Sequence, residues 1–324
     1  MKVIILGYGP MLTNLIAGCM DAGCDIVGVF RYDKVRYPRF DRFFADFFNP
    51  SREYTYIKSH NLYEIDARSV NSAEFKKEVM RLGADVVLVG TWGEKLKKSI
   101  IDLPKIATIN AHPALLPKYR GPNPYLQAIK NLETKSGVTF HLMDEKFDTG
   151  PILSQKVVDI KATDTGLELR ERIVLASRVA VCELMLELDK EVVIPVAQDP
   201  KKASYFTHIT EDDVVLDFSK SAEAVSAQVR GFHPWCKCYF RYERHFFSPN
   251  PYKIETLENN TGLNAPVTLV GAVVEKCHKE KSITILCGDN RLIKMGGVRL
   301  LGPINRLFTS FYIKNNVQVL KKYI

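Results

Sequence analysis

The chain of 324 residues has no long hydrophobic run, because no stretch approaches the roughly 20 uncharged apolar residues that cross a bilayer. Its first residues, MKVIILGYGP, have neither the long apolar core nor the small-residue cleavage site of a signal peptide. These absences argue against a membrane protein and a membrane partner. We therefore expect a cytoplasmic location.

Cysteine is also scarce, with seven scattered residues, so the sequence predicts free thiols and no disulfide framework. The one close pair, Cys236 and Cys238 beside His233, lacks the further ligands that a zinc site needs. We expect no metal and assign the pair no function. Internal repeats and low-complexity tracts are absent, and 46% hydrophobic with 25% charged residues is an ordinary globular composition that excludes wholesale disorder.

The chain is longer than the usual single domain of about 100 to 200 residues, which favours two domains. It begins with an apolar strand pattern at residues 2–7, helical spacing at 10–22 and a second strand at 25–30. The alternation continues with helices at 72–82 and 97–101, strands at 85–89, 107–110, 137–143 and 152–160, and a long helix at 165–188. This pattern predicts an α/β fold with a doubly wound, mainly parallel sheet, whose ligands lie at the carboxyl ends of the strands.

The helical pattern stops after residue 189, and two prolines mark 190–207 as a linker. A helix at 222–229 and β-rich runs at 267–274, 282–286 and 292–298 then predict a small β-barrel. We therefore expect a catalytic domain at 1–189, a linker at 190–207, a barrel domain at 208–302 and a tail at 303–324.

A glycine pair after the first strand, Gly7 and Gly9, resembles the opening of a dinucleotide-binding loop. The third glycine position is Leu12, and Phe30 is followed by Arg31 rather than by an acidic residue. The sequence therefore argues against an NAD- or NADP-linked enzyme.

Polar residues follow two of the expected strands. Asn110 and His112 are two residues apart at the end of one strand, so they share a face, and Asp148 lies in the polar loop after another. Taken singly, these side chains could be a strand-end cap, a buried core histidine and a turn residue. Together they could provide a donor for an oxyanion and an acceptor for a proton.

The segment N-x-H-P-x-L-L-P-x-Y-R-G at 110–121 is followed by S-G-V-T at 136–139 and D-x-G at 148–150, with His112 and Asp148 separated by 36 residues. This set resembles the folate-dependent formyltransferases, a family with a Rossmann-like catalytic domain. The resemblance implies transfer of a formyl group from 10-formyltetrahydrofolate to a primary amine, without a metal. It also implies a catalytic trio of Asn110, His112 and Asp148, in which Asn110 and His112 stabilise the oxyanion, His112 moves a proton and Asp148 orients the imidazole.

The same resemblance implies where the substrates bind. Folate is expected to contact backbone groups along three segments, and its pterin lies near the first of them. Arg42 and Arg120 are expected to contact the acceptor, although Arg120 could instead have a structural role. The expected folate-binding residues are Glu94, Lys95, Leu96, Ala114, Leu115, Leu116, Pro117, Asp144, Glu145, Lys146 and Phe147.

The second domain resembles the carboxy-terminal open, OB-like barrel of methionyl-tRNA formyltransferases at 203–205 (ASY), 215–218 (VLDF) and 229–235 (VRGFHPW). That barrel holds the tRNA backbone, and a net charge of +8 with a pI near 9.0 agrees with a polyanionic partner. The favoured acceptor is therefore the methionyl amino group of initiator tRNA. Related enzymes that modify nucleotide-linked amino sugars carry the same barrel, so an amino-sugar nucleotide is the alternative.

The chain departs from the tRNA enzymes in having GPNP at 121–124, Cys236 after Trp235 and an unmatched tail at 303–324. A third hypothesis is therefore an inactive folate- or RNA-binding paralogue. Residues 31–52 mix arginines with aromatic residues and could either stack on nucleic acid or pack locally. The tail has the same two alternatives, RNA binding or packing as a terminal helix. No protein partner is predicted.

Overall fold

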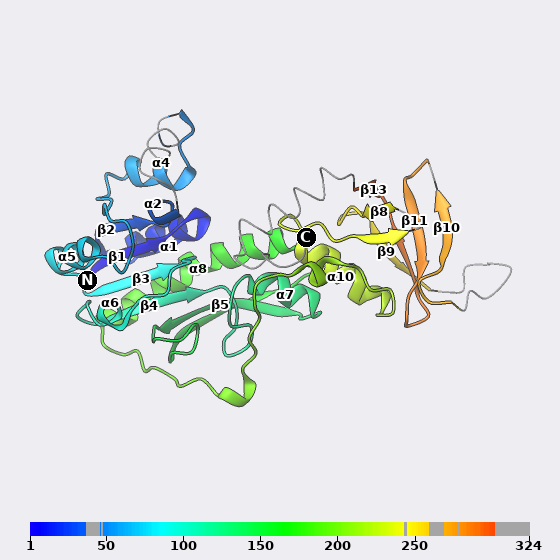
Figure 1. Ribbon diagram of the computed structural model, residues 1–324. Helices are drawn as coiled ribbons and strands as arrows, with labels where there is room; N and C mark the ends of the chain where they lie inside the picture. Colours follow the sequence, from blue (N-terminus) through cyan, green and yellow to red (C-terminus); the bar gives the residue numbers. More distant parts are fainter. Residues whose placement is uncertain (37–45, 47, 243–244, 259–268, 278, 302–324) are drawn as a thin grey trace. The chain divides into compact units, whose positions relative to one another are not determined.

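The computed structural model describes residues 1–301 apart from 37–45, 47, 243–244, 259–268 and 278 (Figure 1). Arg42 and the 303–324 tail lie outside the described residues. The chain forms two compact units. Unit 1 comprises Met1–Gly121, Ser136–Asp159 and Glu171–Phe206, and unit 2 comprises Pro122–Lys135, Ile160–Arg170 and the described residues from Thr207 onward.

Unit 1 contains a six-stranded sheet in the order β2-β1-β3-β4-β5-β6. The first four of these strands in the sheet run parallel, and β5 pairs antiparallel with β4. This confirms the predicted α/β fold with a mainly parallel sheet. The strands are β1 (Lys2–Gly7), β2 (Asp25–Arg31), β3 (Val86–Gly90), β4 (Ala107–His112), β5 (Lys135–Leu142) and β6 (Ile152–Asp159).

Serine side chains cap the N-termini of two helices of unit 1, α4 and α5. In α5 the Ser72 hydroxyl accepts from the Phe75 backbone N–H, and Gly83 ends the helix with a left-handed φ of 63°. In α1 a Cβ at Gly18 would overlap the Arg178 carbonyl, so glycine allows α1 to pack closely on α8. The helices are α1 (Gly9–Asp21), α2 (Asp33–Arg36), α4 (Arg52–Ser59), α5 (Ala73–Leu82), α6 (Lys98–Ile101) and, from Glu171 onward, α8 (Gly166–Asp189), with a 3-10 turn η1 (Pro200–Lys202).

The order in which strands are added to the sheet reverses between β1 and β3. Strand β2 lies on one side of β1, and the later strands lie on the other side. Ligands of open α/β sheets bind outside the carboxyl ends of the strands near such a reversal. The four parallel strands β2, β1, β3 and β4 end at this edge, and β4 ends with His112. The fold therefore places the predicted polar cluster where this class of sheet binds ligands.

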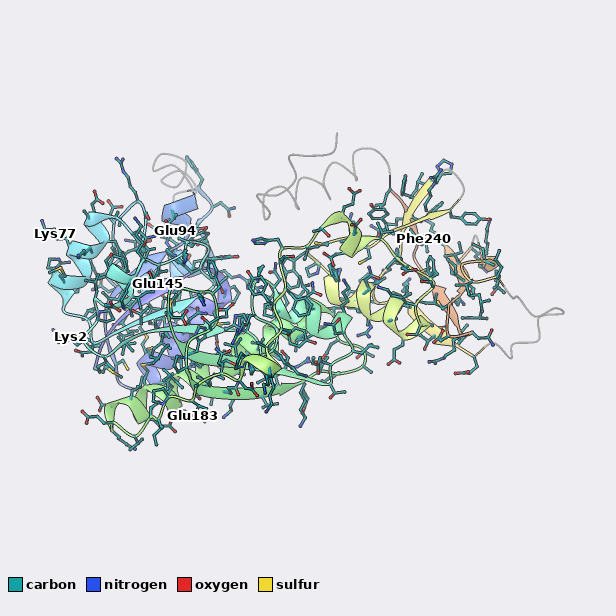
Figure 2. The ribbon with its side chains drawn as sticks, turned by 60° about the horizontal axis from the view of Figure 1, so that its bottom comes forward. Lys2, Lys77, Glu94, Glu145, Glu183 and Phe240 are labelled. Atoms are coloured by element: carbon teal, nitrogen blue, oxygen red, sulfur yellow. The ribbon has the colours of Figure 1, made fainter. Side chains whose placement is uncertain are left out.

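Unit 2 contains antiparallel sheets in the orders β10-β11-β12-β9 and β13-β8-β7 within the described residues. Phe240 lies in this unit (Figure 2) and packs against the rings of Phe218 and Phe247, with centroid separations of 5.6 and 5.9 Å. A β-rich second domain is thus confirmed. Its elements are α7 (Pro124–Lys130), α9 (Glu211–Val214), α10 (Ala222–Phe232), β7 (Phe240–Tyr242), β8 (His245–Ser248), β9 (Ile254–Leu257), β10 (Val273–Cys277), β11 (Ser282–Leu286), β12 (Leu292–Met295) and β13 (Arg299–Leu300).

Two strand predictions in unit 2 were wrong at their limits. Residues 269–272 were predicted as part of a strand but form a turn, because Gly271 has a left-handed φ of 82°, and the strand starts at Val273. The run at 292–298 ends at Met295 for the same reason, since Gly297 has φ 60°. No helix within the described part of the chain has the length and apolarity needed to cross a bilayer.

Candidate active site

Strand β4 delivers the first two polar side chains of the site. Asn110 and His112 are on the same face because side chains alternate along a strand. The antiparallel register with β5 sets Asn110 opposite His141 and His112 opposite Thr139. A second histidine is thereby brought beside Asn110.

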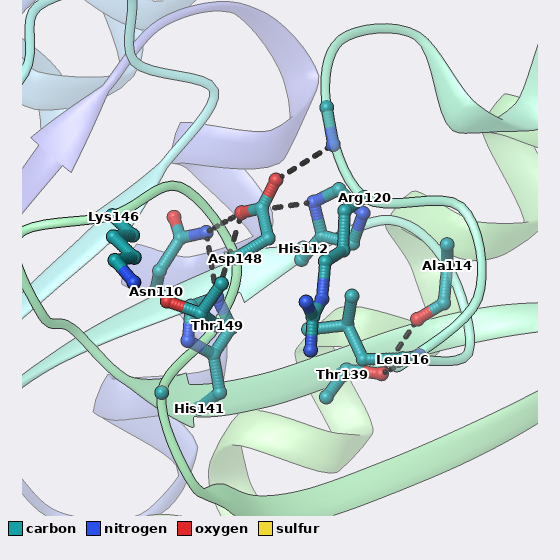
Figure 3. A network of polar contacts seen from close by, with 12 residues as sticks. Asn110, His112, Ala114, Leu116, Arg120, Thr139, His141, Lys146, Asp148 and Thr149 are labelled. Atoms are coloured by element: carbon teal, nitrogen blue, oxygen red, sulfur yellow. Dashed lines mark hydrogen bonds and ion pairs between the residues drawn. The ribbon is translucent and has the colours of Figure 1, made fainter. Parts of the chain in front are cut away.

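The loop after β5 supplies Asp148, whose backbone has a left-handed φ of 58°. One of its carboxylate oxygens, Oδ2, accepts the Gly121 backbone N–H at 2.9 Å. The other, Oδ1, lies 3.4 Å from Asn110 Nδ2, 3.4 Å from His112 Nδ1 and 3.6 Å from His141 Nε2. The three residues predicted as a trio therefore meet around one carboxylate oxygen, together with His141 (Figure 3).

The hydrogen bonds around Asn110 define its orientation. His141 Nδ1 lies 2.8 Å from the Leu142 carbonyl, so in the neutral ring the proton is on Nδ1 and the lone pair is on Nε2. That lone pair accepts from Asn110 Nδ2 at 3.2 Å. The second amide N–H points toward Asp148 at the longer distance of 3.4 Å. His141 thus fixes the amide while leaving one of its N–H groups weakly engaged.

His112 is only 4% exposed, and its Nε2 lies 2.8 Å from the Tyr119 carbonyl. Burial lowers the pKa of His112 below its ordinary 6.5, although Asp148 and the Tyr119 carbonyl act in the opposite direction. The ring is therefore neutral at pH 7. Because Nε2–H donates to Tyr119, the Nδ1 lone pair is available on the side facing Asp148.

Asp148 keeps its charge beside this neutral ring. Burial alone would raise its pKa, but the neighbouring His112 and His141 rings and the hydrogen bond from the Gly121 N–H together lower the pKa to about 2. The site at neutral pH thus combines a neutral imidazole with an ionised carboxylate. This pair can accept a proton on Nδ1 and stabilise the resulting imidazolium.

The loop that follows His112 is fixed by Thr139, which is completely buried. Its hydroxyl donates to the Ala114 carbonyl at 2.6 Å and accepts from the Leu116 N–H at 3.1 Å. Gln155 Nε2 adds hydrogen bonds to the Thr139 hydroxyl and to the Leu116 carbonyl, each at 2.9 Å. One hydroxyl therefore fixes the loop on which the folate-binding prediction for 114–117 depends.

Replacing Thr139 by valine keeps the shape of the side chain but leaves buried partners without their hydrogen bonds. We expect the free energy of unfolding to fall by about 1 to 3 kcal/mol. Urea denaturation measures this loss, with Thr139→Ser as the control that retains the hydroxyl. Equal stability of the valine and serine variants would show that the hydroxyl does not fix the loop.

The predicted folate-binding residues fall into two groups. Glu94 accepts from the Ser69 hydroxyl and the Val70 N–H at 2.6 and 3.0 Å, and Leu96 is 2% exposed in the core, so both stabilise local structure. In the 144–148 loop, Asp144 accepts from the Lys146 N–H, and the Phe147 side chain is 51% exposed. An exposed aromatic ring and a polar loop leave this segment accessible for the folate contact predicted for it.

The remaining predicted residues are placed as follows. Lys95 accepts through its backbone carbonyl from Asn71, and Glu145 and Lys146 are exposed. Leu115 is half-buried in the loop after His112, and Pro117 follows a cis peptide bond. Arg120 is half-buried, and its guanidinium donates to Gln198.

Sequence reasoning missed several residues of this network. His141 could have been found from its position two residues after Thr139 on the same predicted strand, but only the β4–β5 register shows that it faces Asn110. The Tyr119 carbonyl and the Gly121 N–H act through backbone atoms, which no side-chain motif reports. Gln198 is 50 residues from Asp148 in the chain and no pattern links the two.

No group of three histidine, cysteine or acidic side chains that could hold a metal ion occurs among the residues described. Cys236 and Cys238 are both buried, and burial raises the pKa of the Cys236 thiol to about 12. That thiol is therefore protonated at neutral pH.

Two protein-family sequence models match this chain. The one described as formyl transferase covers residues 1–183, and the one described as formyl transferase, C-terminal domain covers residues 208–302. The chain belongs to the formyl transferase family. It is a transferase, and the match covers both the sheet that carries the site and the β-rich second region.

Individual proteins with similar sequences are also formyltransferases. The methionyl-tRNA formyltransferase of Caldanaerobacter subterraneus is 28% identical over 93% of this chain and 94% of its own. That of Clostridium novyi is 31% identical over 68% of each chain. Among solved structures, an N-formyltransferase from Helicobacter canadensis in complex with folinic acid and dTDP-3-aminofucose matches with a TM-score of 0.65 at 18% identity, covering 91% of this chain and 99% of that one. This last likeness concerns the fold.

Proposed function

We propose that this formyltransferase moves the formyl group of 10-formyltetrahydrofolate to the amino group of methionyl-tRNA, with Asn110, His112 and Asp148 as its catalytic residues. The observation that supports methionyl-tRNA as the acceptor is the extent of the sequence match. Methionyl-tRNA formyltransferases of Caldanaerobacter subterraneus and Enterococcus faecalis each align over 93% of this chain, at 28 and 25% identity. The activity would serve translation initiation.

His112 is the proton acceptor in this mechanism. The amine attacks the formyl carbon, a nitrogen–carbon bond forms, and the nitrogen becomes cationic. His112 Nδ1 carries a lone pair because Nε2–H donates to Tyr119, so it can accept the amine proton. Asp148, 3.4 Å away and ionised, stabilises the imidazolium that results. The proton then goes to the folate nitrogen as the bond from that nitrogen to the formyl carbon breaks.

Asn110 stabilises the negative charge that develops on the formyl oxygen. One of its amide N–H groups donates to His141 at 3.2 Å, which fixes the amide plane. The other makes only the 3.4 Å contact with Asp148, so it is weakly engaged and can donate to an oxyanion while the amide plane keeps its orientation. An amide in a preset orientation stabilises the transition state without reorganising during the reaction.

An amino-sugar nucleotide is the second candidate acceptor, and the charge distribution favours it. Residues 208–302, which match the C-terminal family model, contain twelve lysines and arginines and eleven aspartates and glutamates. A domain that binds the tRNA backbone gains its affinity from positive charge. Residues 208–302 thus contribute little to the net charge of +8. Residues 303–324 contribute more, because they contain four basic residues and no acidic one.

Turnover with 10-formyltetrahydrofolate and each acceptor tests the proposal. We expect formylation of methionyl-tRNA, with an affinity for tRNA that falls steeply as salt is raised because phosphate contacts release counterions. The comparison acceptor is a dTDP-linked amino sugar under the same conditions. Formylation of the sugar nucleotide alone would replace the first candidate by the second, and formylation of neither would support an inactive paralogue.

A further inference from the structure

Gln198 is an inward-facing residue in an exposed segment of unit 1. Residues 194–197 and 199–200 around it are exposed, whereas Gln198 is half-buried. Its Nε2 donates to the Asp148 carbonyl at 3.0 Å and to the Gly150 carbonyl at 2.7 Å. Its Oε1 accepts from Arg120 Nε and Nη2 at 3.2 and 2.7 Å. One amide therefore makes four hydrogen bonds, all to the segments that form the candidate site.

Only one orientation of the Gln198 amide satisfies these partners. Arg120 offers donors alone, and the two backbone carbonyls offer acceptors alone, so the oxygen must face Arg120 and the nitrogen must face the turn. A carboxylate at this position would place negative charge against two carbonyl oxygens. An amide is the side chain that fits both sides at once.

The turn that Gln198 holds needs external support. Asp148 has a left-handed φ of 58°, which is unfavourable for a residue with a side chain. A Cβ at Gly150 would overlap the Leu142 carbonyl, so the backbone runs close to the end of β5 there. The Asp148 carboxylate reaches His112 and Asn110 only if this backbone is held in place.

We propose that Gln198 is a positioning residue for Asp148, fixing the backbone of the 148–150 turn while Arg120 fixes the Gln198 amide. This inference rests on the catalytic role proposed for Asp148. Neither Gln198 nor Arg120 contacts Asn110 or His112 through these hydrogen bonds, and their effect on the reaction passes through the placement of one carboxylate. The connector after α8 thereby becomes part of the site.

Two substitutions test the contact between Gln198 and the turn. Gln198→Leu removes all four hydrogen bonds, and Gln198→Glu keeps the acceptor for Arg120 but removes the donor to the two carbonyls. We expect both to lower kcat by about 10- to 100-fold, because misplacing a catalytic group by roughly 1 Å has an effect of that size. The KM for the acceptor amine is expected to change by less than about 3-fold, since an interaction that acts in the transition state alters kcat.

The matched control is the neighbouring Asp199, whose carboxylate accepts the Lys201 N–H and caps the 3-10 turn. Asp199→Ala disturbs the same connector without touching the 148–150 turn and should keep kcat within about 2-fold of the parent, as independent surface changes do. Thermal melting of each variant establishes that it is folded.

A double-mutant cycle separates this inference from the proposed function. In an Asp148→Asn background, Gln198→Leu should lower the residual kcat by less than about 3-fold, since two changes that act through one group are not additive. If Asp148→Asn alone is strongly impaired while Gln198→Leu is fully active, the positioning role is wrong and the trio stands. If Gln198→Leu gives its full loss in both backgrounds, it acts by another route. A fully active Asp148→Asn would overturn the trio itself.

Discussion

His112→Ala is expected to lower kcat by about 10² to 10⁴-fold, which is the usual contribution of a positioned general base. The variant removes the Nδ1 lone pair that faces Asp148 and leaves the backbone of β4 intact. Single-turnover formylation measures the loss, and circular dichroism and thermal melting check the fold. The exposed His60 provides the control, because His60→Ala should retain the parental rate. A near-parental rate for the folded His112→Ala variant would remove His112 from the mechanism.

The pH dependence of the parent enzyme tests the same role. A base must be unprotonated to accept a proton, so kcat/KM should fall as pH drops through the pKa of His112. Burial lowers that pKa below the ordinary 6.5, so the limb caused by His112 should lie below pH 6.5, separate from the limb at about pH 8 that protonation of the acceptor's own amino group causes. A His112 imidazole whose NMR signals titrate above pH 6.5 in the free enzyme would contradict a neutral resting ring.

The sequence predicted most elements of unit 1, although not α2 and α4, because the signals of the elements it found are local. Strands β1 and β3 are short apolar runs buried on both faces, and α5 begins at a serine cap and ends at Gly83. The short strands β7, β8 and β9 gave no comparable signal. They alternate weakly over three or four residues, and their pairing partners decide their structure.

The candidate site could be predicted in part for a similar reason. Asn110 and His112 are two residues apart on one strand, so their shared face follows from period two. The approach of Asp148 depends on a loop with a left-handed φ, which the sequence indicates only through family resemblance. The contact of His141 depends on the β4–β5 register, and the contacts of Gln198 depend on a connector that returns to the site. Local sequence patterns predict neither of these.

Asp148→Asn tests electrostatics separately from shape. The substitution keeps the size of the side chain but removes the charge that stabilises protonated His112, so we expect kcat to fall by about 10²-fold or more. The Asp148 carboxylate also raises the pKa of His112 against the effect of burial. Without it the pKa of His112 falls further, and the acidic limb of the residual activity should move to lower pH than in the parent.

The direction of that shift distinguishes two accounts of Asp148. If the carboxylate acts on His112 through its charge, the acidic limb moves down in pH and Asp102→Asn, which removes an exposed ion pair with Lys98, leaves rate and profile unchanged. If Asp148 only closes the turn through the Gly121 N–H, its amide variant keeps an oxygen acceptor for that group and the limb stays in place. A near-parental kcat with an unmoved limb would therefore assign Asp148 to the backbone of the site and exclude an effect of its charge on His112.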